Sequence, residues 1–365
     1  MFKRILCLVA LILTVALLLI HLPEGTNVLP GTRENERQLL RVWTLSSVGG
    51  GQAWLKAALK RYEKQHPGVM TYLRQARPED LTAEGAVLPD LVLYMPGDLQ
   101  GGELFVPLTG EMQAEEALLR CGRWRGSQVG LPLCWAGYVL AVSAELEPEN
   151  ALTPEPTTLL GRPALTAAPF ATATPGYPAQ AALAAAEALQ CPRGAGFFSL
   201  AMLLKADVRP NVPESFGTLD SAAVYQRYRT GQCASALLTT GQAVALDGLI
   251  LEGQAPSSRY LVPDEVITEQ VWLGSIPSDS GDGAADLLAY LTSQEAQKLL
   301  ADQGLQPVSA SLRLYAGGAN AEIARAAQRG LTAINAFADP QKVAQGAWQV
   351  YQGSMTMNDA LLPVI

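Results

Sequence analysis

Histidine and cysteine are scarce in this chain of 365 residues. It has two histidines, His21 and His66, and five irregularly spaced cysteines with no Cys-x-x-Cys pair. Two histidines leave little scope for a histidine-dependent metal site or catalytic triad. The spacing of the cysteines fits neither a zinc framework nor a dense disulfide scaffold. We expect no metal ion and no cofactor.

Charged residues are few, and basic ones are in the minority. They make up 16% of the chain, with 34 acidic and 26 basic residues and a net charge of −8. A nucleic-acid-binding protein needs a basic face to neutralise phosphates, so this balance argues against nucleic acid. Because 49% of the residues are hydrophobic, the chain can bury a sizeable core. The composition predicts an acidic globular protein that acts through shape and binding.

Residues 1–22 predict a membrane segment. Lys3 and Arg4 precede an almost uninterrupted apolar run of about the length that a spanning helix needs. No small-residue cleavage pattern follows, so an uncleaved anchor is favoured over a cleaved signal peptide. The positive flank keeps the N-terminus inside, and in either case the body is extracytoplasmic. Residues 23–38 are polar and contain proline and glycine, which is typical of a tether.

The body of the chain begins with alternating strand and helix patterns. β-rich runs lie at residues 39–45, 69–74 and 90–95, and an amphipathic helix pattern lies at 52–66. This β-α-β order implies a parallel sheet covered by helices, and hence an α/β fold.

The last third of the chain carries helix patterns. They lie at residues 283–291, 293–303, 319–337 and 340–352. Thr292 stands three residues before Glu295, and this capping-box pattern predicts that Thr292 caps the second of these helices.

Seven local motifs follow one another along the body. They are RVWTL at 41–45, KRYEKQHPGV at 60–69, LPDLVLYM at 88–95, LFVPL at 104–108, VGLPLCWAGYVLAVSAEL at 129–146, YRTGQCASALL at 228–238 and LLAYLTSQEAQKLLADQGLQPVSAS at 287–311. In this order they resemble the extracellular solute-binding proteins of ABC importers, in the carbohydrate-type family that includes maltose-binding protein. The resemblance covers nearly the whole body, from about residue 39 to residue 361.

The resemblance implies a two-lobed, type II periplasmic-binding-protein fold with a hinge and an interlobe cleft. The N-lobe would comprise residues 39–133 and 263–306, and the C-lobe residues 144–259 and 312–365. The hinge crossings would lie at 134–143, 260–262 and 307–311. A ligand would sit between the lobes, which close by hinge motion.

The resemblance also implies ligand contacts on the loop after the first strand, which here carries Ser46, Ser47 and a glycine turn at 49–51. Their hydroxyls and backbone N–H groups can hydrogen-bond a polar solute, although the glycines can equally serve only as a tight strand-to-helix turn. Thr239 and Thr240 follow a later strand and are further candidates.

Four aromatic residues stand at positions where relatives contact ligand, namely Tyr94, Trp135, Tyr138 and Tyr177. An aromatic face packs on the C–H face of a sugar, so these residues fit a carbohydrate site. Ordinary core packing is the alternative interpretation for these aromatic residues.

The implied function is capture of a small polar solute, with carbohydrate as the leading class, and its delivery to an ABC permease. No bond is made or broken, so the protein would not be an enzyme. Two departures from the family's pattern argue against a sugar ligand. Many sugar binders of the family carry charged or amide side chains in the loop after the first strand, where this chain has serines. The tryptophan that the family often has after the strand ending at residue 238 is missing.

Two other interpretations stay open. A membrane-tethered sensor or accessory interaction protein with a diverged cleft is favoured by the uncleaved anchor and by the absence of a lipoprotein cysteine. A cleft enzyme would use Cys134 as nucleophile, but a thiolate needs a neighbouring base or cation, and the body offers no histidine except His66. A small buried hydrophobe is the favoured role for Cys134.

Overall fold

The computed structural model describes residues 38–83, 85, 87–110, 112–144, 158–159, 162–163, 196–203, 225–226, 228–231 and 235–365. The predictions for the membrane segment, for the tether up to residue 37 and for Tyr177 lie outside the described residues. No helix within the described ranges is both long enough and apolar enough to cross a bilayer.

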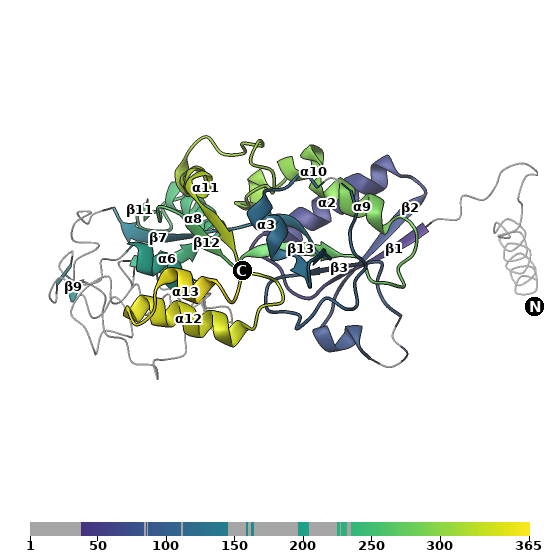
Figure 1. Ribbon diagram of the computed structural model, residues 1–365. Helices are drawn as coiled ribbons and strands as arrows, with labels where there is room; N and C mark the ends of the chain where they lie inside the picture. Colours follow the sequence, from purple (N-terminus) through teal and green to yellow (C-terminus); the bar gives the residue numbers. More distant parts are fainter. Residues whose placement is uncertain are drawn as a thin grey trace, which may run out of the picture.

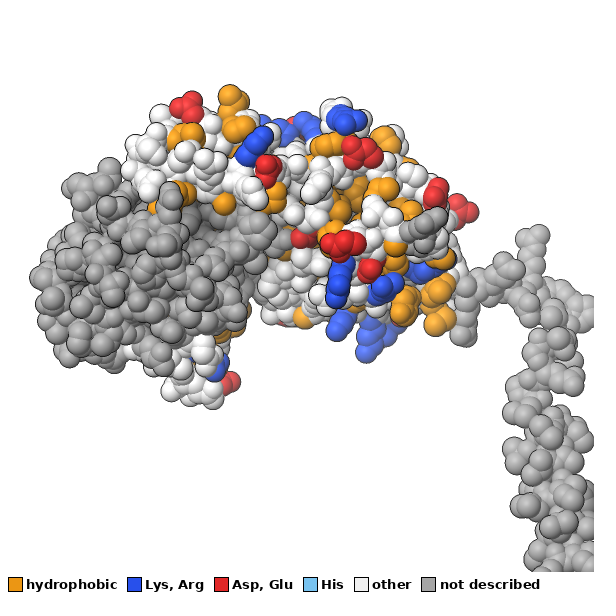
Figure 2. All heavy atoms as spheres, turned by 90° about the horizontal axis from the view of Figure 1, so that it is seen from below, with side chains coloured by type: hydrophobic (Ala, Val, Ile, Leu, Met, Phe, Trp, Pro, Cys, Tyr) orange, Lys and Arg blue, Asp and Glu red, His pale blue; other side chains and the backbone are white. Residues whose placement is uncertain are grey.

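The described chain contains two main sheets, which lie toward opposite ends of the folded molecule (Figure 1). We call the part around the five-stranded sheet the first half and the part around the three-stranded sheet the second half. Acidic and basic side chains are interspersed on the described part of the face shown in Figure 2.

The first half contains a sheet of order β2-β1-β3-β13-β6. Its strands are β1 (Gln38–Thr44), β2 (Val69–Gln75), β3 (Leu91–Tyr94), β6 (Leu131–Trp135) and β13 (Val271–Ser275). Strand β1 runs parallel to β2 and β3, whereas β13 runs antiparallel to β3 and β6. The predicted parallel β-α-β start is confirmed.

Helix α2 (Gly51–Gln65) connects β1 to β2 and buries the apolar stripe that its spacing predicts, including Trp54, Leu55 and Leu59. Gly50 precedes the helix with a φ of 83°, a left-handed conformation that glycine adopts without strain. A Cβ atom on Gly51 would meet the Trp272 ring at 3.0 Å. The glycine turn therefore lets the helix begin directly against the sheet.

Shorter elements complete the first half. They are η1 (Pro78–Leu81), α3 (Glu116–Cys121), β4 (Arg123–Trp124), β5 (Ser127–Gln128), α9 (Ala284–Thr292), α10 (Gln294–Lys298) and η4 (Ala301–Gln303).

The second half contains an antiparallel sheet of order β10-β7-β11. Its strands are β7 (Tyr138–Ser143), β10 (Ser235–Thr239) and β11 (Ser258–Leu261). A smaller parallel pair joins β12 (Val266–Thr268) to β14 (Leu331–Ala333), and β8 (Thr158–Leu159) pairs with β9 (Arg162–Pro163). The helices are α6 (Gly196–Leu203), α8 (Thr240–Leu251), α11 (Gly318–Arg329), α12 (Pro340–Gln352) and α13 (Met357–Leu361).

The described chain passes three times between the halves. It leaves β6 for β7 through Ala136 and Gly137, returns from β12 to β13 through Glu269 and Gln270, and leaves again after Gln306. The sequence placed the second crossing at residues 260–262. In the structure Tyr260 and Leu261 still belong to β11, and the chain joins the five-stranded sheet only after β12 has paired with β14. Because two β-rich runs follow one another here, the sequence pattern does not show which of them ends the second half.

Two helix predictions are corrected. Ser293 caps α10, since its hydroxyl accepts from the Ala296 backbone N–H at 3.4 Å. Thr292 is still the last residue of α9, and its hydroxyl donates to the Ala289 carbonyl at 3.0 Å. The single helix expected over residues 319–337 ends at Arg329, and β14 follows.

Candidate functional site

The three passages between the halves lie side by side and are joined by backbone hydrogen bonds. Trp135 and Gln306 exchange two bonds, with N–O distances of 3.2 and 2.8 Å, and the Ala136 N–H donates to the Gln270 carbonyl at 2.8 Å. Each passage is therefore bonded to a neighbour. Together they form the connection between the halves.

Buried side chains tie the same passages together. Gln297, at 2% exposure, donates to the Leu133 carbonyl at 2.7 Å and accepts from the Val308 N–H at 3.0 Å. The Thr268 hydroxyl donates to the Ala136 carbonyl at 2.7 Å. The Gln297 bonds link the first passage to the third, and the Thr268 bond links the first passage to the second.

The halves are also in contact beside this connection, and glycine stands at two of the contact places. A Cβ atom on Gly241, in the first turn of α8, would lie 3.2 Å from the Gly49 carbonyl oxygen in the loop after β1. In the loop after β3, the Gly97 N–H donates to the Ala336 carbonyl at 3.1 Å, and a Cβ on Gly97 would meet Pro340 at 3.1 Å. A side chain at position 241 would therefore require the Gly49 carbonyl to shift slightly, whereas glycine fits without a shift.

We call the residues around these contacts the seam. It comprises Ser46, Ser47, Gly49, residues 96–98, Tyr138, residues 239–241, Glu269 and Gln270. Five of its members are predicted ligand contacts, namely Ser46, Ser47, Tyr138, Thr239 and Thr240.

Ser46 and Ser47 lie half-buried at the end of β1, as expected of the loop after the first strand. The Ser46 hydroxyl hydrogen-bonds the Asp98 carboxylate, which also accepts from the Met95 N–H at 2.7 Å. The Ser46 carbonyl accepts from the Trp272 indole N–H at 2.8 Å. Asp98 is thus a seam residue that the sequence analysis missed, because its partner stands 52 positions away in the chain.

Tyr138 and Glu269 form a buried pair on two neighbouring passages. The Tyr138 hydroxyl donates to Glu269 Oε1, and the Gln270 amide donates to both groups, at 3.1 and 3.0 Å. Glu269 is 1% exposed, and its Oε2 has no hydrogen-bond partner among the described residues. Glu269 was not among the predicted residues, because only the tertiary pairing of β12 and β13 places it here.

Thr239 and Thr240 lie at the start of α8, next to the first passage. The Thr239 hydroxyl accepts from the Gln242 N–H at 3.3 Å and so caps the helix. The Thr240 N–H donates to the Gly137 carbonyl at 3.0 Å. Thr240 is fully buried, and its hydroxyl has no partner within the described part of the chain.

Tyr94 and Trp135 are both buried. Tyr94 is fully buried, stacks on Phe105 at 5.7 Å between ring centroids, and bonds the Ser275 hydroxyl at 2.8 Å; burial raises the pKa of its phenol well above the usual range. Tyr94 is therefore a core residue in this structure. Trp135 is 2% exposed, and its indole N–H donates to the Pro307 carbonyl at 3.0 Å.

Cys134 follows the interpretation as a small buried hydrophobe. It is fully buried, and burial raises the pKa of its thiol well above the usual range. A thiol held in the neutral form is a poor nucleophile.

A family model of bacterial extracellular solute-binding proteins matches residues 44–306. The chain belongs to this family. This solute-binding protein is accordingly extracytoplasmic, and it is a binding protein rather than an enzyme. No curated protein matches it significantly in sequence.

Solved structures share its fold at low sequence identity. The maltose/maltodextrin-binding domain MalE from Bdellovibrio bacteriovorus bound to maltotriose is 15% identical, with a TM-score of 0.51 over 89% of this chain and 97% of that one. A cyclo/maltodextrin-binding protein complexed with maltotetraose is 14% identical, with a TM-score of 0.50 over 91% and 96%. The maltodextrin-binding protein MalE1 from L. casei BL23, without ligand, is 13% identical, with a TM-score of 0.50 over 89% and 96%. The solute-binding protein therefore has the mixed α/β fold of maltodextrin-binding proteins.

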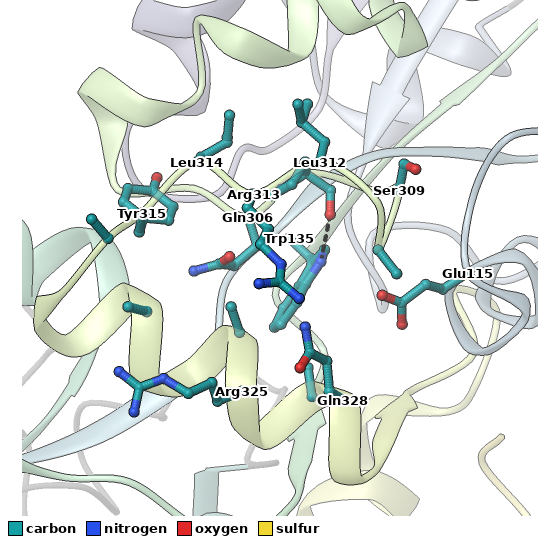
Figure 3. Close-up of a pocket in the computed structure, with 16 residues that line it drawn as sticks. Glu115, Trp135, Gln306, Ser309, Leu312, Arg313, Leu314, Tyr315, Arg325 and Gln328 are labelled. Atoms are coloured by element: carbon teal, nitrogen blue, oxygen red, sulfur yellow. Dashed lines mark hydrogen bonds between the residues drawn. The ribbon is translucent and has the colours of Figure 1, made fainter.

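This solute-binding protein also has a cavity of about 640 Å³ beside the third passage. Trp135 and Gln306 contribute to its lining, together with Glu115 from the N-terminal end of α3 and several residues of α11 (Figure 3). None of the seam residues lines it. It is a second candidate site, separate from the seam.

Proposed function

We propose that this solute-binding protein captures a small polar solute at the seam, by movement of its halves about the three passages, and delivers it to an ABC importer. Two buried oxygens carry the proposal. Glu269 Oε2 and the Thr240 hydroxyl are buried without partners in the described chain, although nearly all buried polar groups in folded proteins are hydrogen-bonded. A bound solute would supply the missing bonds.

These two oxygens belong to adjoining positions. Thr240 is bonded to Gly137, and the next residue, Tyr138, holds the carboxylate of Glu269 through its hydroxyl. The Thr240 hydroxyl, at the start of α8, and the Glu269 carboxylate, on the second passage, are therefore linked through the two consecutive residues Gly137 and Tyr138. A solute with several hydroxyls fits such an arrangement, because each hydroxyl both donates and accepts.

The charge of the seam disfavours an anionic solute. Its residues include the carboxylates of Asp98 and Glu269 and no lysine or arginine. Carboxylates accept hydrogen bonds from hydroxyls and repel anionic groups. Carbohydrate is the class we propose, supported by the solved relatives whose structures contain maltotriose and maltotetraose.

We propose Ser46, Ser47 and Thr240 as direct contacts of the solute, and Tyr138 as the residue that positions Glu269. Trp135, Tyr177 and Thr239 stay predicted contacts. Residues 39–133 stay the proposed first part of the N-lobe, and residues 144–259 the proposed first part of the C-lobe. We further propose that residues 1–22 anchor the protein to the cell membrane.

A second candidate function is a membrane-tethered sensor or accessory protein whose cleft has diverged. The placement of the aromatic residues favours it, since Tyr94, Trp135 and Tyr138 are all buried and bonded within the protein. Such a protein would bind no carbohydrate at the seam.

Isothermal titration of the full chain with maltotriose, and with a panel of mono- and oligosaccharides, distinguishes the two. Glu269→Gln should weaken binding of the carbohydrate by tenfold or more, because a charge-assisted bond is lost. The matched control is Glu265→Gln, an exposed glutamate four residues earlier in the same segment. Absence of binding to every carbohydrate, from a protein that melts cooperatively, would favour the sensor or accessory function.

A further inference from the structure

The cavity beside the third passage has the size and the lining of a ligand site. Its volume of about 640 Å³ lies within the usual range for small-molecule pockets, roughly 300–1,000 Å³. Apolar side chains form much of its wall, including Pro307, Leu312, Leu314 and Ala321. An apolar wall of this kind suits the hydrocarbon part of a ligand.

Most of the polar groups in this lining are already engaged. The Tyr315 hydroxyl donates to the Leu305 carbonyl at 2.6 Å, and the Gln306 amide donates to the Asn320 carbonyl at 2.9 Å. Arg325 pairs with Glu322 on its own helix, at 2.9 Å. The Tyr315 and Gln306 groups shape the cavity, and Glu322 offsets the charge of Arg325.

Arg313 is different. It belongs to the segment that follows the third passage, and its side chain points into the cavity toward Gln328 (Figure 3). Within the residues that the structure describes, its guanidinium makes no hydrogen bond and no ion pair, and the Gln328 amide makes no hydrogen bond either. A guanidinium is a rigid fork of donors that matches a carboxylate in two parallel bonds.

Glu115 also lines the cavity and limits where an anion can bind. Its carboxylate points into the cavity from the start of α3, and it is half-buried (Figure 3). A carboxylate ligand is therefore repelled from the α3 side and attracted to the Arg313 side. The apolar wall then receives the rest of the ligand.

We infer that this cavity binds a small amphipathic organic acid, with its carboxylate on Arg313 and its hydrocarbon part against the wall formed by Leu312, Leu314 and Ala321. The site is separate from the seam and does not depend on what the seam binds. It is a second ligand site of this solute-binding protein, and its ligand is anionic where the proposed seam solute is neutral.

Isothermal titration of the full chain with three probes tests the inference. The probes are 4-phenylbutyrate, its neutral amide 4-phenylbutanamide, and acetate, which carries the charge without the hydrocarbon. The acid should bind at least about tenfold more tightly than either of the others, because it alone satisfies both Arg313 and the apolar wall. Equal affinity for the acid and the amide, or no binding of the acid, would overturn the inference.

Variants assign the interaction to the cavity. Arg313→Gln should remove the preference for the acid over the amide. Arg329→Gln should keep it, because this arginine of α11 does not line the cavity and bonds the Asp264 carbonyl instead. Glu115→Gln should tighten binding of the acid severalfold by removing the repulsion. A wild-type affinity for the acid in Arg313→Gln would overturn the assignment.

Discussion

The carbonyl oxygen of Gly49 lies so close to Gly241 that a Cβ atom at Gly241 would stand 3.2 Å away from it. Gly49 belongs to the loop after β1 in the first half, and Gly241 belongs to the first turn of α8 in the second half. A separation of 3.2 Å is tighter than most contacts of a real Cβ atom. The absence of a side chain at Gly241 therefore lets the two halves lie this close together.

Gly241→Val should hold the halves apart and lower solute affinity by about tenfold, equivalent to roughly 1.4 kcal/mol of binding free energy. The larger side chain must displace the Gly49 loop before the seam can close. Titration calorimetry measures the affinity, and small-angle scattering measures whether the solute-loaded protein stays expanded. Gly248→Val is the matched control, because Gly248 lies on the same helix and a Cβ there meets nothing within 4 Å. Equal affinities of the two variants would contradict this role of Gly241.

Gln297→Leu should destabilise the fold by about 3 kcal/mol. The side chain makes three hydrogen bonds to buried backbone groups, to Leu133, Leu291 and Val308, and leucine leaves all three without a partner. Chemical unfolding at equilibrium gives the change in free energy. The exposed Gln294 offers the control, since Gln294→Leu should stay within about 0.5 kcal/mol of the wild type. A wild-type stability of Gln297→Leu would show that the third passage does not depend on this residue.

Cys121 and Cys134 should resist alkylation in the folded protein. Both are buried, and burial raises the pKa of both thiols well above the usual range, so that little thiolate is present at neutral pH. Iodoacetamide labelling followed by peptide mass spectrometry assigns the modification to each cysteine. Labelling of both is expected only after unfolding in guanidinium. Rapid labelling of native Cys134 would reopen the interpretation as a cleft nucleophile.

The sequence allowed the start of the fold to be predicted because its patterns there are local. The spacing of Trp54, Leu55 and Leu59 determines which face of α2 packs on the sheet, and all three residues lie within this one helix. The strand-helix-strand order then implies parallel pairing, as the register of β1 with β2 confirms. The later boundary at Glu269 was not found, since two β-rich runs lie on either side of it and only tertiary pairing separates them.

The candidate site was predicted only in part. Ser46 lies at the seam as expected, but its bond to Asp98 joins residues 52 positions apart and leaves no trace in local sequence. Tyr94 shows the opposite case. An aromatic residue at a strand end can face a cleft or the core, and the stacking with Phe105 that decides between them is a long-range contact.

The central claim, that this protein binds a small solute between its halves, is tested most directly by the melting temperature of the full chain against a panel of solutes. The panel should contain sugars, oligosaccharides, amino acids, polyamines and phosphate esters. A ligand at 100 times its dissociation constant stabilises the folded state by about 2.7 kcal/mol, which corresponds to a shift of roughly 5–10 °C for a domain of about 150–250 residues. A shift of this size with carbohydrates, diminished in Glu269→Gln, is the result that the account predicts. A cooperative transition that no solute in the panel moves would contradict it.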